Sequence, residues 1–314
     1  MKSAVVQEIS VVIPVYQAQS LVDELLRQLT NELTGLNVSY EIILVEDRSR
    51  DQSWREIQKG CRTYPNVKAV RLSRNFGQHY AISAGLQRAS GEWIVVMDCD
   101  LQDQPSEIKN LYAESKKGFD VVLARRVLRQ DSWLKRASSR MFYGVLGYLT
   151  GSEQDASIAN FGIYHSKVIA AINSMPESIR YFPTMVKWVG FHSTKLDVAH
   201  SARPEGKTSY CLKKLVNLAL DICLANSEKP IRLTIKFGLL VALIGLVYAL
   251  FIAIRALLGE IPVPGYASLL VSLWVLSGLM ISIIGVVGLY VGKSFEGIKK
   301  RPLFVVDEVI DNEG

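Results

Sequence analysis

Three acidic residues, Asp98, Asp100 and Asp103, follow an apolar run at residues 93–97. An apolar run that ends abruptly in acids is typical of a buried strand that delivers side chains to the rim of a sheet. Two carboxylates separated by one residue can share a divalent cation, and Mg²⁺ is usually held by one or two carboxylates together with substrate phosphates. A polar turn gives the same pattern, so the pair alone is weak support for a metal. We take Asp98 and Asp100 as candidate ligands of Mg²⁺ or Mn²⁺ at a nucleotide-sugar site.

A second pair of acids follows another apolar run. Glu46 and Asp47 come directly after residues 41–45, which are apolar except for the first. Ligands of parallel sheets bind outside the carboxyl ends of the strands, so we expect both acidic strand ends on one rim. A single Asp after a strand is often a helix N-cap, and Asp51 and Asp103 have that alternative. Two acidic ends on one rim favour a ligand site.

The elements that carry these acids alternate along the chain. Short β-branched runs predict strands, and apolar residues at helical spacing predict the helices between them. The predicted strands are residues 9–15, 41–45, 67–72, 93–97 and 120–124, with a partly extended stretch at 186–198. The predicted helices are residues 21–33, 51–60, 77–89, 105–117, 133–149 and 167–172. This alternation predicts an α/β domain with a mostly parallel sheet.

The composition divides the chain in two. Of the 314 residues, 49% are hydrophobic and 21% are charged, and most of the hydrophobic excess lies after residue 230. The net charge of +6 would suit nucleic acid. Because no basic patch with interleaved aromatic residues precedes the apolar region, we expect no nucleic-acid partner. An anionic membrane surface or an anionic substrate explains the charge better.

Cysteine usage and the N-terminal residues indicate the compartment. A chain of this size needs no disulfide framework, and the cysteines match no zinc-binding spacing. They are Cys61, Cys99, Cys211 and Cys223. Residues 1–10 lack the charged and then apolar pattern of a cleaved signal peptide. We therefore expect the first domain to stay in a reducing cytoplasm.

Two long uncharged runs lie in the last third of the chain. Residues 237–254 and 261–291 contain no charged residue, and each is long enough for the roughly 20 residues of a bilayer crossing. We predict a membrane hairpin with a short turn that contains Pro262 and Pro264. Basic residues flank both runs, at Lys229, Arg232, Lys236, Lys293, Lys299, Lys300 and Arg301. By the positive-inside rule, both ends of the hairpin then face the cytoplasm.

These patterns predict four regions. Apolar residues at helical spacing over 212–224, just before the uncharged runs, predict an interfacial helix on the lipid headgroups. The regions are an α/β domain at 1–210, a juxtamembrane amphipathic helix at 211–230, two transmembrane helices at 231–292 and a cytoplasmic tail at 293–314.

Two basic segments lie beside the predicted α/β core. Residues 125–133 are either a solvated charge run or a segment close to an anionic substrate. Residues 200–210 place Arg203 and Lys207 on either side of Gly206. This arrangement suits a clamp on a diphosphate that the backbone approaches closely. Arg203 and Lys207 are therefore candidate anion-binding residues.

Six stretches carry an ordered set of motifs: Val12-Ile13-Pro14-Val15-Tyr16, Leu44-Val45-Glu46-Asp47, Ser73 to His79, Ala84-Gly85-Leu86, Asp98 to Asp103 and Arg203 to Tyr210. Together they resemble the inverting GT-A, family 2, polyisoprenyl-phosphate glycosyltransferases. This family includes bacterial enzymes that load glucose or 4-formamido-arabinose onto undecaprenyl phosphate, and the dolichol-phosphate mannose synthases. Residues 75–79 and 129–133 resemble the formamido-arabinose branch most. The resemblance covers nearly the whole chain.

The resemblance implies a GT-A nucleotide-sugar-binding domain followed by an interfacial helix and a transmembrane hairpin. The implied donor is a nucleotide sugar, with UDP as the expected nucleotide. The implied acceptor is a polyprenyl phosphate, with undecaprenyl phosphate expected, at the cytoplasmic face of a bacterial inner membrane. Relatives are often homo-oligomers, including tetramers.

The resemblance also implies residue roles by motif position. Pro14 and Asp47 would line the nucleotide pocket. Asp98 and Asp100 would hold the ribose and the metal-bound diphosphate, and Arg203 and Lys207 would neutralise the leaving diphosphate. The candidate donor and cation residues are Pro14, Val15, Tyr16, Asp47, Asn75, Gln78, Asp98, Asp100, Gln102, Arg125, Arg203 and Lys207. The candidate catalytic residues are Asp100, Asp155, Arg203 and Lys207.

The chain departs from the family pattern in three places. Glu46 and Arg48 stand where relatives often show Asp and Gly, and Cys99 stands where alanine is common. Residues 155–162 match only loosely the segment in which relatives place an acid beside the acceptor, so Asp155 is an offset equivalent. His79 has two readings, a substrate contact or a hydrogen-bonded structural histidine.

Two other functions fit part of the sequence. A processive polysaccharide synthase resembles the first domain, but it normally carries a Gln-x-x-Arg-Trp motif and more spans, and the chain shows neither. A membrane scaffold whose GT-A domain only binds nucleotide would not need Asp98, Asp100 and the basic loop at 203–210. We therefore expect a membrane-tethered glycosyltransferase.

Overall fold

The computed structural model of the chain describes residues 7–126, 158–177, 180–198, 265–299 and 301–311, with isolated positions between 231 and 258. The chain divides into two compact units. The first comprises Met1–Ser139, Asp155–Ser209 and Pro302–Gly314, and the second comprises Arg140–Gln154 and Tyr210–Arg301. Most of the predicted α/β domain at 1–210 falls in the first unit, whereas residues 140–154 are assigned to the second, and the last residues of the chain belong to the first unit as well.

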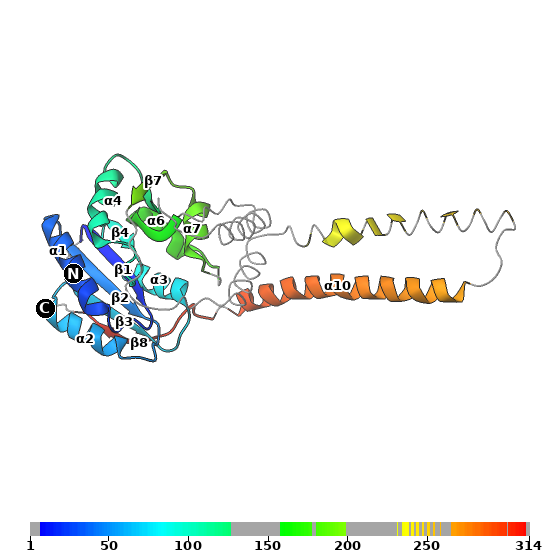
Figure 1. Ribbon diagram of the computed structural model, residues 1–314, viewed down its shortest axis with the longest axis horizontal. Coiled ribbons are helices and arrows are strands. Elements are labelled where there is room, and N and C mark those ends of the chain that lie inside the picture. The colour runs from blue at the N-terminus through cyan, green and yellow to red at the C-terminus, as the bar shows by residue number, and fades with distance from the viewer. Residues whose placement is uncertain are drawn as a thin grey trace. The chain divides into compact units, whose positions relative to one another are not determined.

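An eight-stranded sheet forms the centre of the first unit (Figure 1). Its order is β7-β5-β6-β4-β1-β2-β3-β8. The strands are β1 Ile9–Val15, β2 Tyr40–Glu46, β3 Val67–Leu72, β4 Trp93–Val96, β5 Val121–Arg126, β6 Ile158–His165, β7 Ser193–Val198 and β8 Val306–Ile310. All strands except β6 and β8 run in the same direction. The predicted α/β fold with a mostly parallel sheet is confirmed.

Helices cover both faces of the sheet. Side chains of each strand alternate between the two faces, and successive residues of the central strands are apolar, so both faces need to be covered. Val11 and Ile13 pack with α1 (Val22–Gly35), α2 (Ser53–Thr63) and α4 (Ile108–Ser115), which η1 (Pro105–Glu107) precedes. Val12 packs on the other face with α3 (Gln78–Leu86), α6 (Ser166–Ser174) and α7 (Phe182–Val189). These strand residues are fully buried, and each buried aliphatic side chain contributes about 1.5–3 kcal/mol of transfer free energy. The layered core fixes where each strand ends.

Within the described residues, the predicted helices and strands agree with the structure except at residues 182–192, where α7 was not predicted, and at β6 and β8. The extended stretch predicted for residues 186–198 is wrong in its first part, because residues 186–189 complete α7 and only Ser193–Val198 forms a strand. The strands β6 and β8 have no counterpart in the prediction. Asn160 and Gly162 interrupt the apolar character of β6, and β8 is short and acidic, so neither has a typical strand composition.

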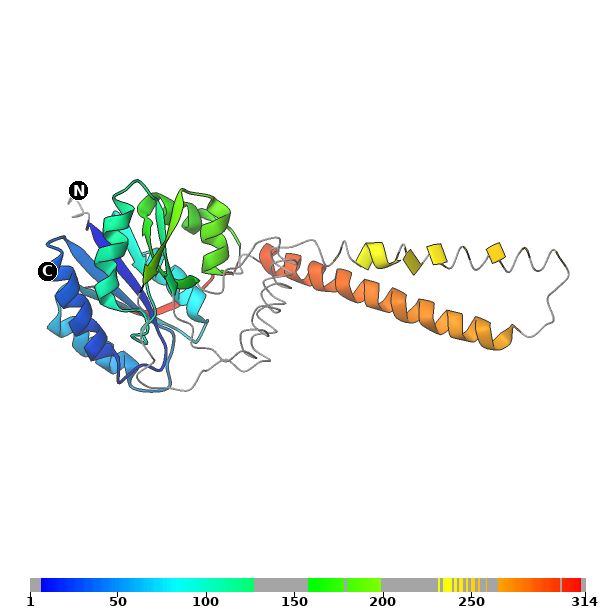
Figure 2. The ribbon, with the colours of Figure 1, turned by 45° about the horizontal axis from the view of Figure 1, so that its top comes forward.

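The described part of the second unit contains one long helix, α10, at Tyr266–Ile298 (Figure 2). Taken over the described residues alone, no helix has both the length and the apolar character needed to cross a membrane. The transmembrane hairpin at 231–292 and the boundaries of the four regions stay predictions. The helices expected at 133–149 and 212–224 lie outside the described residues.

A buried polar cluster ties the strands together at the amino end of the sheet, opposite the acidic rim. The Glu41 carboxylate accepts hydrogen bonds from the Ser10 hydroxyl at 2.6 Å and from the Ser90 amide at 2.7 Å. Lys68 Nζ lies 3.1 Å from its second oxygen. Burial raises the pKa of Glu41, but these contacts outweigh it and hold the pKa below the ordinary carboxyl value. The charged carboxylate therefore stabilises the fold.

Replacing Glu41 with glutamine is expected to lower the free energy of unfolding by about 1–3 kcal/mol at neutral pH, because the buried network loses its negative charge and one of its two acceptor oxygens. The folded-state pKa is lowered, so the wild-type contribution is present above the ordinary Glu pKa and is lost as the pH falls through the folded value. The difference in melting temperature between the two proteins should shrink in acid. Glu24→Gln, which breaks the exposed pair with Arg27, is the control and should change little. Equal melting temperatures for wild type and Glu41→Gln at pH 7 would contradict this role.

Candidate active site

The two acidic strand ends lie on one edge of the sheet. β1 pairs in parallel with β2 on one side and with β4 on the other, so their carboxyl ends share that edge. Glu46 closes β2 and Asp98 follows β4. The shared rim expected for these acids is therefore confirmed, and it is the position where open parallel sheets bind ligands.

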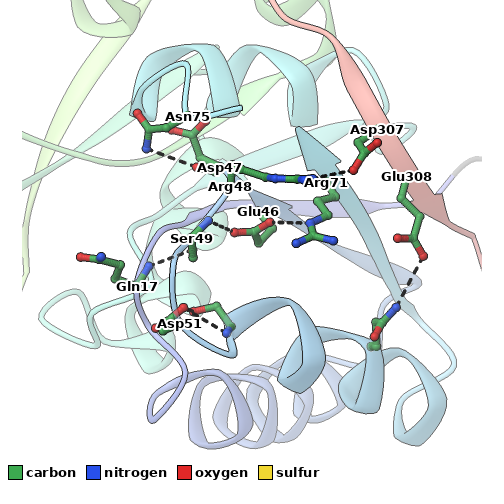
Figure 3. A network of polar contacts seen from close by, with 12 residues as sticks. Gln17, Glu46, Asp47, Arg48, Ser49, Asp51, Arg71, Asn75, Asp307 and Glu308 are labelled. Atoms are coloured by element: carbon green, nitrogen blue, oxygen red, sulfur yellow. Dashed lines mark hydrogen bonds and ion pairs between the residues drawn. The ribbon is translucent and has the colours of Figure 1, made fainter. Parts of the chain in front are cut away.

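Asp47 holds the segment between β3 and α3. Its two carboxylate oxygens accept hydrogen bonds from the amides of Phe76 and Gly77, at 2.7 and 2.8 Å. Its own carbonyl accepts a bond from the Asn75 side chain at 3.2 Å (Figure 3). Burial raises the pKa of Asp47, although the two amide bonds oppose that shift. Asp47 is only 2% exposed. Its carboxylate therefore fixes the backbone of residues 75–77 and does not line an open surface.

The segment at 75–79 aims Gln78 at the acidic pair. Gly77 adopts a φ of +106°, a conformation that glycine tolerates far better than other residues, and α3 begins at the next residue. α3 lies close against β1, because a Cβ on Gly85 would come within 2.4 Å of Val12 Cγ1. Gln78 Nε2 then donates a hydrogen bond to Asp98 Oδ1 at 2.6 Å. The two acidic strand ends are thus connected through one segment.

The carboxylates of Asp98 and Asp100 suit a divalent cation shared with a diphosphate. Both residues are partly exposed, and Asp100 Oδ1 accepts a bond from the Gln102 amide at 3.2 Å, which fixes the turn. Within the described residues, no group of three or more His, Cys, Asp or Glu side chains is arranged to hold a metal ion. Two carboxylates with open positions for phosphate oxygens and water match the usual Mg²⁺ arrangement. The residues present therefore fit a cation that arrives with its substrate.

The loop after β2 is tied on several sides. Glu46 is fully buried, accepts a hydrogen bond from the Ser49 amide, and pairs with Arg71 of β3 at 3.2 Å (Figure 3). The Ser49 hydroxyl accepts a bond from the Gln17 amide at 3.0 Å, which joins the loops after β1 and β2. These contacts hold the loop at residues 47–51 in one arrangement.

Backbone strain gathers at the same edge. Gln17, Arg48 and Leu101 have φ values of +52°, +54° and +57°, in the left-handed region that non-glycine residues rarely adopt. They follow β1, β2 and β4, respectively. Strained residues persist where the surrounding structure fixes them, and they concentrate at functional sites. This clustering marks the rim of β1, β2 and β4 independently of the acidic residues.

His79 is a neutral histidine in this structure. Burial of the imidazole lowers its pKa to about 4, and its ring contacts Tyr181 edge-on at 4.7 Å between centroids. Among the described residues, Nδ1 has no hydrogen-bond partner. A neutral ring supplies no positive charge to a diphosphate, which favours a structural role for His79, although within the described part of the chain the hydrogen bond expected for that role is not present at Nδ1.

The structure brings part of the predicted site together. Pro14 and Val15 are buried in β1, so their side chains are not open to a ligand, whereas Tyr16 is 41% exposed. Arg125 pairs with Asp197 of β7, with Nη2 and Oδ2 3.0 Å apart. The described rim residues are Tyr16, Asp47, Asn75, Gln78, Asp98, Asp100 and Gln102. The predicted residues Asp155, Arg203 and Lys207 lie outside the described part of the chain.

Sequence reasoning missed three residues that hold the rim, namely Ser49, Arg71 and Asp307. Their contacts join segments distant along the chain, and none belongs to a motif. The one sequence signal is Arg48, which stands where relatives often carry glycine and which pairs with Asp307.

The fold matches that of a known sugar-transferring enzyme. The glucosyl-3-phosphoglycerate synthase of Mycobacterium tuberculosis, crystallised with Mn²⁺, UDP and phosphoglyceric acid, aligns with a TM-score of 0.52 at 15% identity, over 70% of this chain and 77% of that chain. A mostly parallel sheet with acidic residues at the carboxyl ends of β2 and β4, in this arrangement, is the GT-A fold.

The sequence comparisons are more specific. The model of glycosyl transferase family 2 matches residues 10–171. An uncharacterized glycosyltransferase of Synechocystis sp. is 35% identical over 303 residues, 96% of this chain and 95% of that protein. The undecaprenyl-phosphate 4-deoxy-4-formamido-L-arabinose transferase of Edwardsiella ictaluri is 33% identical over 308 residues, 97% of this chain and 95% of that protein. The chain belongs to glycosyl transferase family 2 and is a glycosyltransferase, as the motif resemblance indicated.

Proposed function

We propose that this glycosyltransferase moves one sugar from a UDP-sugar to the phosphate of a polyprenyl phosphate, undecaprenyl phosphate in bacteria, with inversion at the anomeric carbon. The product is a lipid-linked sugar for cell-envelope glycan or lipopolysaccharide modification. The observation that carries the donor half of the proposal is the connected rim, in which Asp47 orders the segment at 75–77 and Gln78 meets Asp98.

The donor site follows from the charges on that rim. Asp98 and Asp100 are the residues that would hold Mg²⁺ or Mn²⁺, and the cation would supply positive charge against the donor diphosphate. Tyr16, exposed at the end of β1, offers an aromatic surface beside the nucleotide loop. Arg203 and Lys207 follow β7, which ends on the same edge as β1. They would donate hydrogen bonds to the departing diphosphate.

The reaction needs little base catalysis. A phosphate monoester has a second pKa of roughly 6, so the acceptor is already largely anionic at neutral pH. One acceptor oxygen forms a bond to the anomeric carbon, while the bond from that carbon to the diphosphate oxygen breaks and UDP leaves with the electron pair. Stabilising the developing charge on the diphosphate is therefore the main task of the site. Asp155 precedes β6, whose amino end lies on this edge, and would position the acceptor phosphate.

The acceptor half of the proposal has two sources of support. The Edwardsiella relative, which the chain matches over 97% of its length, is named for undecaprenyl phosphate. In addition, many of the described large apolar side chains of α10 are exposed by about half or more, including Leu269 at 65% and Ile281 at 70%, although Leu279, Ile283 and Val286 are less exposed. An apolar surface of this kind needs a covering that is not water.

We also propose that residues 231–292 form a hairpin in the bacterial inner membrane with the GT-A domain on the cytoplasmic side. The two uncharged runs at 237–254 and 261–291 and their basic flanks support this placement. The chain should remain in the membrane fraction after washing with sodium carbonate, and release into the supernatant would refute the hairpin. We further propose that the chain forms a homo-oligomer. Measurement of its mass in detergent should give a multiple of the mass of one chain, and a monomer would refute the oligomer.

A donor screen tests the proposal. The purified full-length chain is incubated with undecaprenyl phosphate, Mg²⁺ or Mn²⁺, and each of a panel of radiolabelled UDP-sugars. One or a few donors should give label that partitions with the lipid. If the chain binds UDP but no donor labels the lipid, the proposed reaction is wrong.

Replacing Asp155 with alanine is expected to lower kcat by about 10-fold or more while leaving UDP affinity unchanged, because the residue would align the acceptor rather than bind the donor. Steady-state kinetics with varied acceptor and calorimetry with UDP measure the two quantities. Glu153→Ala removes an acid two positions away and is the matched control. A loss of UDP affinity in Asp155→Ala would place this residue in the donor site instead.

A further inference from the structure

The last strand of the chain reaches the donor side of the sheet. β8 pairs antiparallel with β3, with Arg71 opposite Glu308 and Leu72 opposite Val306. The Ser73 amide donates to the Val305 carbonyl at 2.9 Å, which extends the pairing past the carboxyl end of β3. The first residues of β8 therefore lie at the edge where β2 and β4 end in acids. Figure 3 shows Asp307 of this strand beside the loop that follows β2.

Asp307 contacts the strained residue of that loop. Arg48 Nη1 lies 2.6 Å from Asp307 Oδ2, although the two residues are 259 positions apart. Arg48 sits directly after Asp47 and has a φ of +54°. Glycine adopts this conformation easily, whereas arginine is strained in it. An anchor on the Arg48 side chain compensates for the strain and fixes the course of the loop.

The pair is suited to a local task rather than to global stability. The two side chains are 43% and 46% exposed, and exposed ion pairs contribute little to the stability of a fold. The remaining loop contacts act on its neighbours: Glu46 accepts from the Ser49 amide, and the Ser49 hydroxyl accepts from the Gln17 amide. Among the described contacts of the loop at 47–51, the ion pair between Arg48 and Asp307 is the one made by the C-terminal strand.

We propose that Asp307 is a positioning residue for donor binding, acting through Arg48. This inference rests on the proposed function, in which the loop at 47–51 meets the nucleotide. The C-terminal strand is then part of the donor site, and not only the edge of the sheet. Asp307 touches no substrate itself, so it should affect how tightly the donor is held more than how fast the sugar moves.

The test compares Asp307→Asn with Glu308→Gln in the full-length chain. Glu308 is the next residue of the same strand, and its side chain contacts Gln58 of α2 at 3.5 Å instead of the loop. Asp307→Asn is expected to raise KM for the UDP-sugar and the Kd for UDP about 3- to 5-fold, near the upper range of an exposed ion pair, with kcat within about 2-fold. Glu308→Gln should match wild type. Asp307→Glu and the exchanged pair Arg48→Asp with Asp307→Arg should recover donor affinity.

A second measurement needs no substrate. Trypsin cleaves after Arg50, which is exposed in the same loop. Cleavage there should be faster in Asp307→Asn than in wild type or Glu308→Gln. The inference is overturned if Asp307→Asn and Glu308→Gln give equal UDP affinity and equal cleavage, or if Asp307→Asn changes kcat alone. If wild type transfers no sugar, the proposed function fails, while UDP affinity and cleavage still decide the role of Asp307.

Discussion

The Asp100→Asn enzyme is expected to lose at least about 100-fold in kcat with Mg²⁺ or Mn²⁺ while the protein still folds and enters the membrane. Removing one stabiliser of charge that develops in the transition state costs about 10²–10³ in rate. Asp100 is partly exposed, and its Oδ1 accepts from the Gln102 amide, a bond that asparagine can keep through its own oxygen. The change therefore removes charge with little change in shape. Steady-state rates over a range of Mn²⁺ concentrations measure the effect.

The control for this variant removes an acid at the opposite edge. Asp120 precedes β5 and pairs with Lys167, so Asp120→Asn also deletes one negative charge and one ion pair. Its turnover and cation dependence should stay near those of wild type. Turnover of Asp100→Asn equal to that of Asp120→Asn would refute the role of Asp100 in cation binding.

The Asp47→Ala variant is expected to bind UDP about 10- to 100-fold more weakly, because two amides lose a buried acceptor at once. Each unpaired buried donor costs about 1–3 kcal/mol, and about 1.4 kcal/mol corresponds to tenfold in affinity. The amides belong to Phe76 and Gly77, so the segment that carries Gln78 toward Asp98 loses its support. Calorimetry with UDP measures the affinity, and differential scanning fluorimetry should show a lower melting temperature.

Two comparisons separate support of the segment from general loss of fold. Asp23→Ala changes an exposed acid in the first turn of α1 and should leave both measurements unchanged. Asp47→Asn keeps one acceptor oxygen and should fall between wild type and Asp47→Ala in UDP affinity. If Asp47→Ala binds UDP as wild type does, the segment at 75–77 does not depend on this carboxylate.

The parts of the fold that follow from local pattern were predictable. β1, β2 and β3 are short β-branched or apolar runs, and α1 carries its leucines on one buried face. The alternation of strand and helix implies parallel pairing, and parallel pairing places the acids after β2 and β4 on one edge. The rim was predictable because it depends only on strand direction.

The parts that depend on pairing between distant residues were not predictable. β6 contains Asn160 and Gly162 and is stabilised by β4 and β5 on its two sides. β8 is an acidic run whose strand conformation depends on β3. Arg48 and Asp307 are 259 positions apart, and no local sequence pattern predicts their contact. The burial of Asp47 likewise depends on residues 75–77, which are separated from it along the chain by α2 and β3.

The structure of the lipid product tests the proposed reaction most directly. The full-length chain is given its best UDP-sugar and undecaprenyl phosphate, and the purified lipid is analysed by mass spectrometry and by NMR of the anomeric proton. We predict a mass equal to undecaprenyl phosphate plus one sugar, with an anomeric configuration opposite to that of the donor. A lipid that has gained a sugar phosphate, a chain of several sugars on one lipid, or retained configuration would contradict single inverting transfer to the lipid phosphate.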